Sequence, residues 1–535
     1  MLRTDLIRPL AELLRDNARH VPEKTAFADV RRSVTWLDLD MRTERVAGHL
    51  AGLGVQQADR VLLYLHDRVE VVEIYLAILR RGGISAIVHT GLSDAELAAV
   101  LTDSQAVAVF TDTENLEQVR RLSADLADLT VILVDQDSED ADIPSYATLA
   151  ETEPDLRGDA DLGLDDLAFL SYTAGTTGTP RGVLFSQRNV TWAIAACYAP
   201  ILGLGADDRV CCPLPMAEGL TQQVGIVGVV AVGATGWIAA ASASDLGDLI
   251  TQRTGFLTDL ARQRITFVAG MHSTYRDLLW AAGERDVTLP DLRTCLVAGS
   301  AGLSELRTAI EEKFGATLLG SYMTMETTGP VTVSWPTSDR ADLAAGLPVP
   351  GVSVRVIDPR TGADAGIGAE GEIWVSGPNV AAGGYHGRTG GSRAVLTDGW
   401  YHTGDLGRRD DLGRLTVTGR LAEMIRRGGE LINPRAIEEL LLGVAGVTAA
   451  VVVGRPDATA GEVPVAYLKT DAGLDVAELV ATCQRLPRTL VPVELCRVDE
   501  VPLARSGRLA RRALLDIPAE TLAVLSADTS RTDLR

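Results

Sequence analysis

Residues 36–130 alternate between segments with helical periodicity and short runs rich in apolar and β-branched residues. Two of these runs lie at residues 60–64 and 106–110. Helices and strands that alternate at this spacing are typical of βα units on a largely parallel sheet. The alternation resumes over residues 261–320, so we expect an α/β protein. The strands expected in this second stretch are residues 265–268 and 295–298.

The length predicts several structural units, because 535 residues are too many for a single core. Closely spaced β-rich segments over residues 351–417 indicate a small β-barrel-like part or a distorted sheet. The strands expected there are residues 353–357, 371–375 and 414–417. An acid-rich stretch at residues 135–166 is expected to be a surface connection.

The sequence changes character after residue 418, where an amphipathic segment at 434–442 precedes an apolar run at 449–453. This pattern predicts a separate α+β domain of about a hundred residues, which is an ordinary domain size. We therefore expect a large N-terminal domain at 1–418, a small C-terminal domain at 419–516 and a flexible tail at 517–535.

The composition excludes some classes of partner. A net charge of −22 would repel a nucleic-acid backbone over most of the surface, although a local nucleotide site is compatible with it. The uncharged residues 224–243 contain four glycines, which favour a buried helix, a glycine turn and a strand over a membrane span. Six cysteines without metal-ligand spacing suit a reducing cytoplasm, and residues 1–20 lack the apolar core of a signal peptide. We expect a cytoplasmic protein.

A loop of small hydroxylated residues and glycines follows a strand-like run at residues 171–183. Glycines let the backbone approach a ligand closely, and successive N–H groups in such a loop form an anion-binding concavity. The loop suits a polyphosphate, although its spacing differs from the common P-loop and a plain turn is the alternative. The candidate nucleotide ligands are Thr173, Ala174, Gly175, Thr176, Thr177, Gly178 and Arg181.

Five further motifs follow the loop in order: Gly299-Ser-Ala-Gly-Leu303, Ser321-Tyr-Met-Thr-Met-Glu326, Asp398-Gly-Trp-Tyr-His-Thr-Gly-Asp-Leu406, Gly419-Arg-Leu-Ala-Glu-Met-Ile-Arg-Arg-Gly-Gly-Glu430 and Leu503-Ala-Arg-Ser-Gly-Arg508. With the loop, they make the chain resemble the adenylate-forming superfamily of acyl-CoA synthetases, peptide-synthetase adenylation domains and luciferases. The resemblance covers about residues 20–515. It implies a large N-terminal domain hinged to a small C-terminal domain.

The resemblance implies a role for each matching residue. Asp405 would accept hydrogen bonds from both ribose hydroxyls, and Glu326 would be the catalytic carboxylate that anchors Mg²⁺. Tyr322 would stack on adenine, and Arg420 would contact the nucleotide at the hinge. The adenine-binding turn would comprise Gly299, Ser300 and Ala301.

The resemblance also implies a two-step reaction with ATP and Mg²⁺. A small acid attacks the α-phosphate, pyrophosphate leaves and an acyl-adenylate forms. The acyl group then passes to CoA, a carrier-protein thiol or an amine.

Two departures from the family pattern bear on this chemistry. Arg508 replaces the lysine that bridges the substrate carboxylate and the α-phosphate, and either general replacement of lysine by arginine or a changed chemistry accounts for it. Glu218 replaces a histidine that lines the acyl site, and its carboxylate would repel an acid unless protonated or paired with a proton donor. Its alternatives are to orient an amine, to act as a general base, or to be a solvated side chain.

Three other departures affect the shape of the site. Met323 replaces a pocket-lining glycine, and Met325 replaces a threonine whose hydroxyl Thr324 or Thr327 would have to supply. Ala422 occupies the usual Asp or Lys position of the hinge.

Three functions remain open from the sequence. The first is an AMP-forming ligase for a small acid. The second is a diazotase-like enzyme that adenylates nitrite and nitrosates an aromatic amine. The third is a nucleotide-binding protein without catalytic activity.

Overall fold

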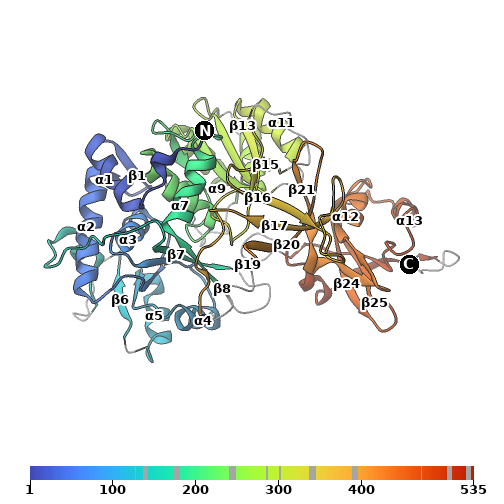
Figure 1. Ribbon diagram of the computed structural model, residues 1–535. Helices are drawn as coiled ribbons and strands as arrows, with labels where there is room; N and C mark the ends of the chain where they lie inside the picture. Colours follow the sequence, from blue (N-terminus) through green and yellow to red (C-terminus); the bar gives the residue numbers. More distant parts are fainter. Residues whose placement is uncertain are drawn as a thin grey trace. The chain divides into compact units, whose positions relative to one another are not determined.

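A computed structural model describes most of the chain. It divides into two compact units, of which the first comprises residues 1–355, 374–403 and 409–416 and the second the remainder (Figure 1). The described residues are 1–126, 128–135, 143–173, 181–239, 249–284, 287–299, 303–336, 345–387, 396–471, 473–502, 509–525 and 532–534.

A nine-stranded sheet in the first unit has the order β15-β14-β13-β12-β11-β9-β10-β1-β2. The pairs from β13 through to β1 are parallel, as the βα alternation predicted. The outer pairs, β1 with β2 and β13-β14-β15, are antiparallel. In spatial order the strands are Leu347–Pro348, Thr332–Val333, Thr317–Tyr322, Thr294–Ala298, Phe267–Met271, Arg209–Cys211, Thr235–Trp237, Thr25–Ala28 and Ser33–Thr35.

A seven-stranded sheet in the same unit has the order β18-β8-β7-β4-β3-β5-β6. Its pairs from β7 to β6 are parallel, while β18, β8 and β7 pair antiparallel. In spatial order the strands are Gly384–Tyr385, Arg181–Ser186, Leu167–Thr173, Ile84–Ile87, Arg60–Tyr64, Ala108–Thr111 and Thr130–Leu133.

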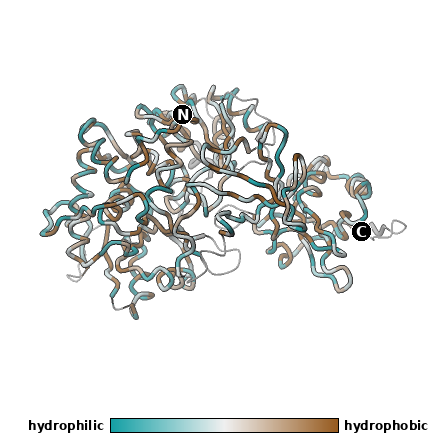
Figure 2. Tube along the Cα trace, viewed as in Figure 1, coloured by the Kyte–Doolittle hydropathy of each residue, from teal (hydrophilic) through white to brown (hydrophobic). Residues whose placement is uncertain are grey.

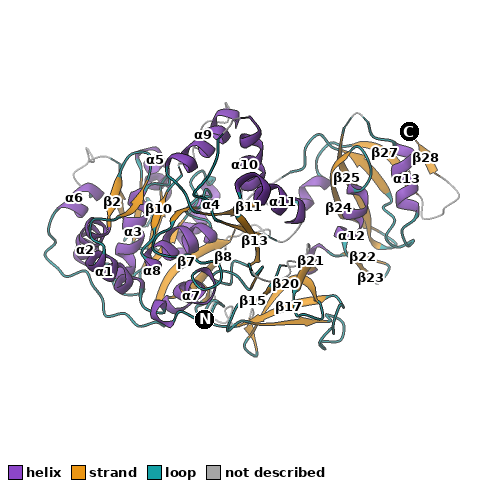
Figure 3. Cartoon of the chain, turned by 90° about the horizontal axis from the view of Figure 1, so that it is seen from above, coloured by secondary structure: helices purple, strands orange, loops and turns teal. Residues whose placement is uncertain are grey.

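Helices pack against both sheets. Helices α1, α2, α3 and α8 lie together, and α9, α10 and α11 form a second group beside β11 and β13 (Figure 3). The helices of this unit are η1 (Thr4–Leu6), α1 (Leu10–His20), α2 (Trp36–Gly52), α3 (Val69–Arg80), α4 (Asp94–Ser104), α5 (Thr113–Leu122), α6 (Tyr146–Glu151), α7 (Gln187–Ala193), η2 (Ile194–Tyr198), η3 (Thr221–Gly228), α8 (Val229–Val232), α9 (Leu249–Arg262), α10 (His272–Glu284) and α11 (Leu303–Phe314).

Two expectations about connecting segments can be compared with these helices. Within residues 224–243, η3 and α8 are followed by a left-handed turn at Gly233 (φ 72°) and by β10, which confirms the helix, turn and strand. No helix in the described part of the chain is long and apolar enough to cross a membrane. The connection at 135–166 is not wholly a surface segment, because Tyr146 of α6 is buried.

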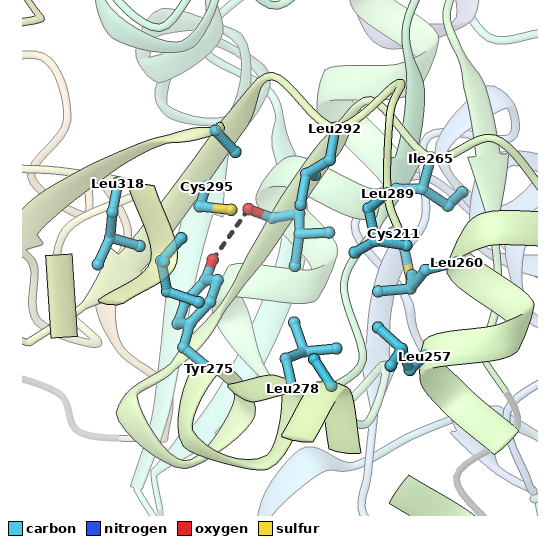
Figure 4. Close-up of a cluster of buried hydrophobic side chains, with 14 of the residues drawn as sticks. Cys211, Leu257, Leu260, Ile265, Tyr275, Leu278, Leu289, Leu292, Cys295 and Leu318 are labelled. Carbon is cyan, nitrogen blue, oxygen red and sulfur yellow. Dashed lines mark hydrogen bonds between the residues drawn. The ribbon is translucent and has the colours of Figure 1, made fainter. Parts of the chain in front are cut away.

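Most of the buried side chains are apolar, and hydrophobic (brown) segments recur along the trace in Figure 2. One core cluster fills the space between the nine-stranded sheet and helices α9, α10 and α11 (Figure 4). Tyr275 of α10 lies inside it, and its hydroxyl lies within hydrogen-bond distance of two backbone carbonyls, those of Leu296 (2.7 Å) and Val268 (3.0 Å), which share its one proton.

We expect Tyr275→Phe to lower the free energy of unfolding by about 1 kcal/mol, because the two carbonyls lose the donor that they share inside the core. Tyr75→Phe is the matched control: Tyr75 is fully buried and its hydroxyl has no hydrogen-bond partner among the described residues. That change should be neutral or stabilising. Urea unfolding of both variants makes the comparison, and equal losses would contradict the assigned role of the Tyr275 hydroxyl.

A five-stranded sheet has the order β16-β17-β20-β19, with β21 paired to β20. Its described strands form an open order, which agrees with the small β-barrel-like part or distorted sheet predicted over residues 351–417. The strands are β16 (Ser353–Ile357), β17 (Gly371–Ser376), β20 (Trp400–Arg409), β19 (Leu396–Thr397) and β21 (Leu415–Arg420).

The second unit has an α+β architecture, and its sheet has the order β23-β22-β25-β26-β27-β28, with β24 paired to β25. The predicted helix 434–442 is α12, and the predicted strand 449–453 lies within β24. The elements are η4 (Leu421–Glu423), β22 (Ile425–Arg427), β23 (Glu430–Ile432), α12 (Pro434–Leu442), β24 (Val447–Asp457), β25 (Gly461–Thr470), α13 (Val476–Gln484), β26 (Glu494–Arg497), η5 (Arg511–Leu515), β27 (Glu520–Leu525) and β28 (Thr532–Leu534).

Part of the segment expected to be a flexible tail is an ordered strand. Within residues 517–535, β27 pairs antiparallel with β26, and Leu522, Ala523 and Leu525 are buried. The expectation of flexibility was therefore wrong for residues 520–525, because these apolar side chains complete the core of the second unit.

Candidate functional site

The candidate residues of the first unit follow the carboxyl ends of parallel strands. In open α/β sheets, ligands bind outside these ends, where the connecting loops gather. In the nine-stranded sheet, Glu218 follows β9, Gly299 directly follows β12 and Glu326 lies four residues beyond β13. In the seven-stranded sheet, the phosphate loop follows β7 directly, since β7 ends at Thr173.

Loops from the two sheets are joined by polar contacts. The backbone N–H of Met216, in the loop after β9, donates to both carboxylate oxygens of Asp67 (3.1 Å each), which follows β3. Nε2 of His89, which follows β4, lies 3.2 Å from Oε1 of Glu218. We call Asp67, His89 and Glu218 the acid–imidazole cluster. The Glu218 carboxylate thus lies at ion-pair distance from an imidazole ring.

Asp67 is the buried member of this cluster. Burial raises the pKa of its carboxyl to about 6, although the Met216 N–H and the nearby His89 and His66 act in the opposite direction. The folded protein therefore holds this proton more tightly than the unfolded chain, in which the carboxyl has its ordinary pKa of 3.8. As pH rises between these two values, the unfolded chain loses its proton first, so the Asp67 contribution to stability falls.

We expect Asp67→Asn to remove this dependence on pH. Relative to the variant, the wild type should lose about 1 kcal/mol of unfolding free energy between pH 5 and pH 7.5. Urea unfolding at the two pH values measures the change, with the exposed Asp155→Asn as control. A difference between wild type and Asp67→Asn that does not vary with pH would contradict the prediction.

Glu326 is held by phenols. Oη of Tyr385 donates to Oε1 of Glu326 (2.7 Å), and Tyr401 also lines the small pocket around this carboxylate. Burial and then the neighbouring Glu326 raise the pKa of the Tyr385 and Tyr401 phenols well above the usual value, so both keep their protons. The pocket lining is Val183, Glu326, Val380, Ala381, Gly384, Tyr385, Leu396 and Tyr401.

Strand pairing brings Arg181 to the same place. Tyr385 of β18 pairs with Val183 of β8, and β8 begins at Arg181. Arg181 is exposed and lies close enough to the Tyr385 phenol to lower its pKa, in opposition to burial. The Arg181 guanidinium and the Glu326 carboxylate therefore both lie near the Tyr385 phenol. This arrangement suits a phosphate group, which the cation would bind, and its accompanying metal ion, which the carboxylate would bind.

The structure describes some of the other residues that were predicted to bind the nucleotide. Gly299 has a positive φ of 98°, and its N–H donates to the Ser321 carbonyl (3.0 Å). Tyr322 ends β13 and is buried. Residues Ala174, Gly175, Thr176, Thr177, Gly178, Ser300, Ala301 and Arg508 lie outside the described residues.

The threonines near Glu326 differ in their environment. Oγ1 of the buried Thr327 accepts from the N–H of Thr324 and donates to the Thr324 carbonyl (3.1 Å each), so it closes a local turn. Thr324, Met323 and Met325 are each partly exposed. Of the two candidates for replacing the missing hydroxyl at position 325, Thr324 is the more available.

The second unit brings two predicted nucleotide ligands together. Nε of Arg420 lies 2.8 Å from Oδ1 of Asp405, whose side chain is 6% exposed. Asp405 lies in β20 and Arg420 ends β21, so the pairing of these strands places the two side chains together. Ala422 lies in η4 directly after them and is exposed.

Sequence reasoning missed four residues: Asp67, His89, Tyr385 and Tyr401. The first two carry a signal that was available, because each follows the carboxyl end of a predicted or parallel strand. Tyr385 and Tyr401 carry no such signal in the sequence, because their role depends on strand pairings that bring distant segments to Glu326.

Comparisons with known proteins agree with this geometry. The AMP-binding enzyme family matches residues 14–386, and the AMP-binding enzyme C-terminal domain matches residues 436–508. The chain belongs to the AMP-binding enzyme family, which confirms the resemblance to adenylate-forming enzymes.

Among its relatives, the chain is 32% identical over 96% of its length to a naringenin synthase of Pestalotiopsis fici, but it spans only 19% of that protein. It is 31% identical to a feruloyl-CoA synthase of Amycolatopsis sp, with 92% of this chain and 96% of the relative covered. The solved o-succinylbenzoate CoA synthetase of Bacillus subtilis, in complex with its acyl-adenylate intermediate, has a TM-score of 0.81, 26% identity and coverage of 96% and 99%.

Proposed function

We propose that the protein is an AMP-forming ligase that activates a small acid with ATP and transfers it to CoA. The observation that carries the proposal is Glu326, held by Tyr385 beside Arg181 at the carboxyl ends of the parallel strands. A lone carboxylate suits Mg²⁺ when phosphate oxygens supply most of the other ligands. In the described residues, no group of three or more His, Cys, Asp or Glu side chains could hold a metal without such help.

The proposed reaction assigns work to residues of this chain. Arg181 and the backbone of residues 174–178 would bind the phosphates, Tyr322 the adenine and Asp405 the ribose. Mg²⁺, bound with ATP, would neutralise charge on the phosphates. One oxygen of the substrate carboxylate forms a bond to the α-phosphorus while the bond from that phosphorus to the bridging oxygen breaks, and pyrophosphate leaves with the electron pair.

Arg508 would pair with the substrate carboxylate and the α-phosphate, in the role that lysine has in the family. We propose the same two domains for this reaction, a large N-terminal domain at 1–418 and a small C-terminal domain at 419–516. In the second step a thiolate sulfur would attack the acyl carbon, and AMP would leave.

We propose an aryl acid as the substrate and CoA as the acceptor. Support comes from the feruloyl-CoA synthase and from the o-succinylbenzoate synthetase, both of which carry an aryl acid and CoA in their names. Both proteins match nearly their whole length to this chain.

Pyrophosphate release from ATP and Mg²⁺ tests the proposal, with a panel of aryl and alkyl carboxylic acids in one arm and nitrite plus aromatic amines in another. Release with an aryl acid, followed by CoA-thioester formation, is the expected result. Release only with nitrite would overturn it in favour of the diazotase-like reaction. ATP binding without release in either arm would favour a nucleotide-binding protein without catalysis.

A further inference from the structure

Glu326 is held through its backbone as well as through its side chain. The N–H of Ala381 donates to the Glu326 carbonyl (2.9 Å), and an antiparallel bridge joins the next residue, Thr327, to Val380. Both contacts come from residues 377–385, which we call the support segment. The segment that carries Glu326 is therefore paired with the support segment like one strand with another.

The end of the support segment also fixes the Glu326 side chain. Tyr385, in β18, donates from its hydroxyl to Oε1 of Glu326 (2.7 Å). Apart from Tyr385 and Tyr401, the residues that line the small pocket with Glu326 are apolar or glycine. Their side chains offer no hydrogen-bond donor, so within this pocket the phenols provide the side-chain contacts that orient the carboxylate.

The support segment is anchored by one buried side chain, that of Asn189 in α7. The amide nitrogen of Asn189 donates to the carbonyls of Pro378 (2.7 Å) and Val380 (2.9 Å), and its amide oxygen accepts from the N–H of Ala382 (3.0 Å). Asn189 is 3% exposed. All three hydrogen bonds hold backbone groups of the support segment, so one amide fixes the path of this segment.

Asn189 and the phosphate-binding cation belong to the same stretch of chain. β8 starts at Arg181, and α7 follows β8 directly. Tyr385 pairs with β8 at Val183, two residues after Arg181. The Glu326 carboxylate is thus tied to the elements that carry the cation. A fixed separation of the two groups matters for Mg²⁺, because this ion demands near-ideal octahedral geometry and takes ligands from both carboxylate and phosphates.

We propose that Tyr385 and Asn189 position Glu326 for Mg²⁺ and so make the binding of ATP depend on the metal. Tyr385 holds one carboxylate oxygen, and Asn189 holds the segment to which both Tyr385 and the Glu326 backbone are bonded. Both are positioning residues, because each acts through Glu326. The inference rests on the proposed function, in which Glu326 binds Mg²⁺ together with the nucleotide.

ATP binding by the full chain tests the inference without depending on catalysis. Isothermal titration calorimetry would measure ATP affinity over a series of Mg²⁺ concentrations and in EDTA without Mg²⁺. In Tyr385→Phe, the Mg²⁺ concentration that gives half of the gain in ATP affinity should rise by about tenfold, since loss of a group that orients a metal ligand weakens metal binding. ATP affinity in EDTA should stay close to that of the wild type.

Tyr75→Phe is the matched control for this change. It removes the oxygen of a fully buried phenol that has no hydrogen-bond partner among the described residues, so it should leave both affinities unchanged. In a Glu326→Gln background, Tyr385→Phe should have no further effect on the Mg²⁺ requirement, because the carboxylate that Tyr385 positions is gone. An additive effect there would contradict a role through Glu326.

Asn189→Asp tests the anchor of the support segment. Aspartate keeps an acceptor for the Ala382 N–H, but it places a charged oxygen against the carbonyls of Pro378 and Val380 in place of a donor. The Mg²⁺ requirement should rise as it does in Tyr385→Phe. Asn17→Asp, which breaks a similar hydrogen bond from a side-chain amide to the Val230 carbonyl (2.6 Å), is the control and should leave the requirement unchanged.

Three results would overturn the inference: an unchanged Mg²⁺ requirement in Tyr385→Phe, an equal loss of ATP affinity in EDTA, or wild-type binding of ATP that does not depend on Mg²⁺. ATP–pyrophosphate exchange with aryl acids separates this failure from that of the proposed function. If Tyr385→Phe raises the Mg²⁺ requirement but the wild type supports no exchange, the positioning role stands and the proposed function falls. If the wild type supports exchange and Tyr385→Phe keeps its Mg²⁺ requirement, the proposed function stands and the positioning role falls.

Discussion

Glu326→Gln is expected to lower ATP–pyrophosphate exchange on the order of 10²–10³-fold, the size of effect seen when one electrostatic contact to the transition state is lost. Glutamine keeps the shape of the side chain and can still accept from Tyr385, so the pocket should survive. The amide oxygen lacks the charge that Mg²⁺ prefers in a ligand. The loss should therefore be accompanied by a higher Mg²⁺ requirement.

The measurement is the exchange rate as a function of Mg²⁺ concentration. Glu312→Gln, on the exposed side of α11 in the same unit, is the matched control and should leave both quantities unchanged. A Glu326→Gln enzyme whose exchange rate is within about twofold of the wild-type rate would show that this carboxylate does not act on the metal or the phosphates.

The largest effect on stability is expected at Glu73, whose side chain is fully buried in α3. Its carboxylate pairs with Arg32 (2.6 Å) and Arg42 (3.0 Å) and accepts a hydrogen bond from Tyr146 of α6. Glu73→Ala should lower the free energy of unfolding by about 3–5 kcal/mol, because two partly buried guanidinium groups would lose their shared counter-ion.

Glu70→Ala is the control for this change. Glu70 pairs with Arg32 at 2.8 Å, but its side chain is 21% exposed, so the loss should be about 1 kcal/mol or less. Urea unfolding followed by tryptophan fluorescence compares the two variants. Similar losses for both would mean that burial of Glu73 adds nothing to the strength of its ion pairs.

Periodicity along the chain was sufficient for much of the fold. The strand expected at residues 60–64, the strand at 353–357 and the helix at 434–442 have the predicted bounds. Each is a local pattern of apolar side chains, and such a pattern selects helix or strand without reference to distant residues. The prediction of a flexible tail was wrong for residues 520–525, because β27 is paired with both β26 and β28.

The residues of the candidate site also fall into two groups: those that sequence motifs identify and those that only the tertiary structure identifies. Glu218, Glu326 and Asp405 were identifiable from motifs, since the chemistry of a carboxylate is evident from its residue type and its place in a motif. Their partners were not identifiable in this way. His89 and Tyr385 are 129 and 59 positions away from the carboxylates that they contact. The pairing of β18 with β8 brings Tyr385 to its place, and the packing of loops from two different sheets brings His89 to Glu218. Residue types and local periodicity thus specify which groups are available, while long-range packing specifies which of them share protons and charge.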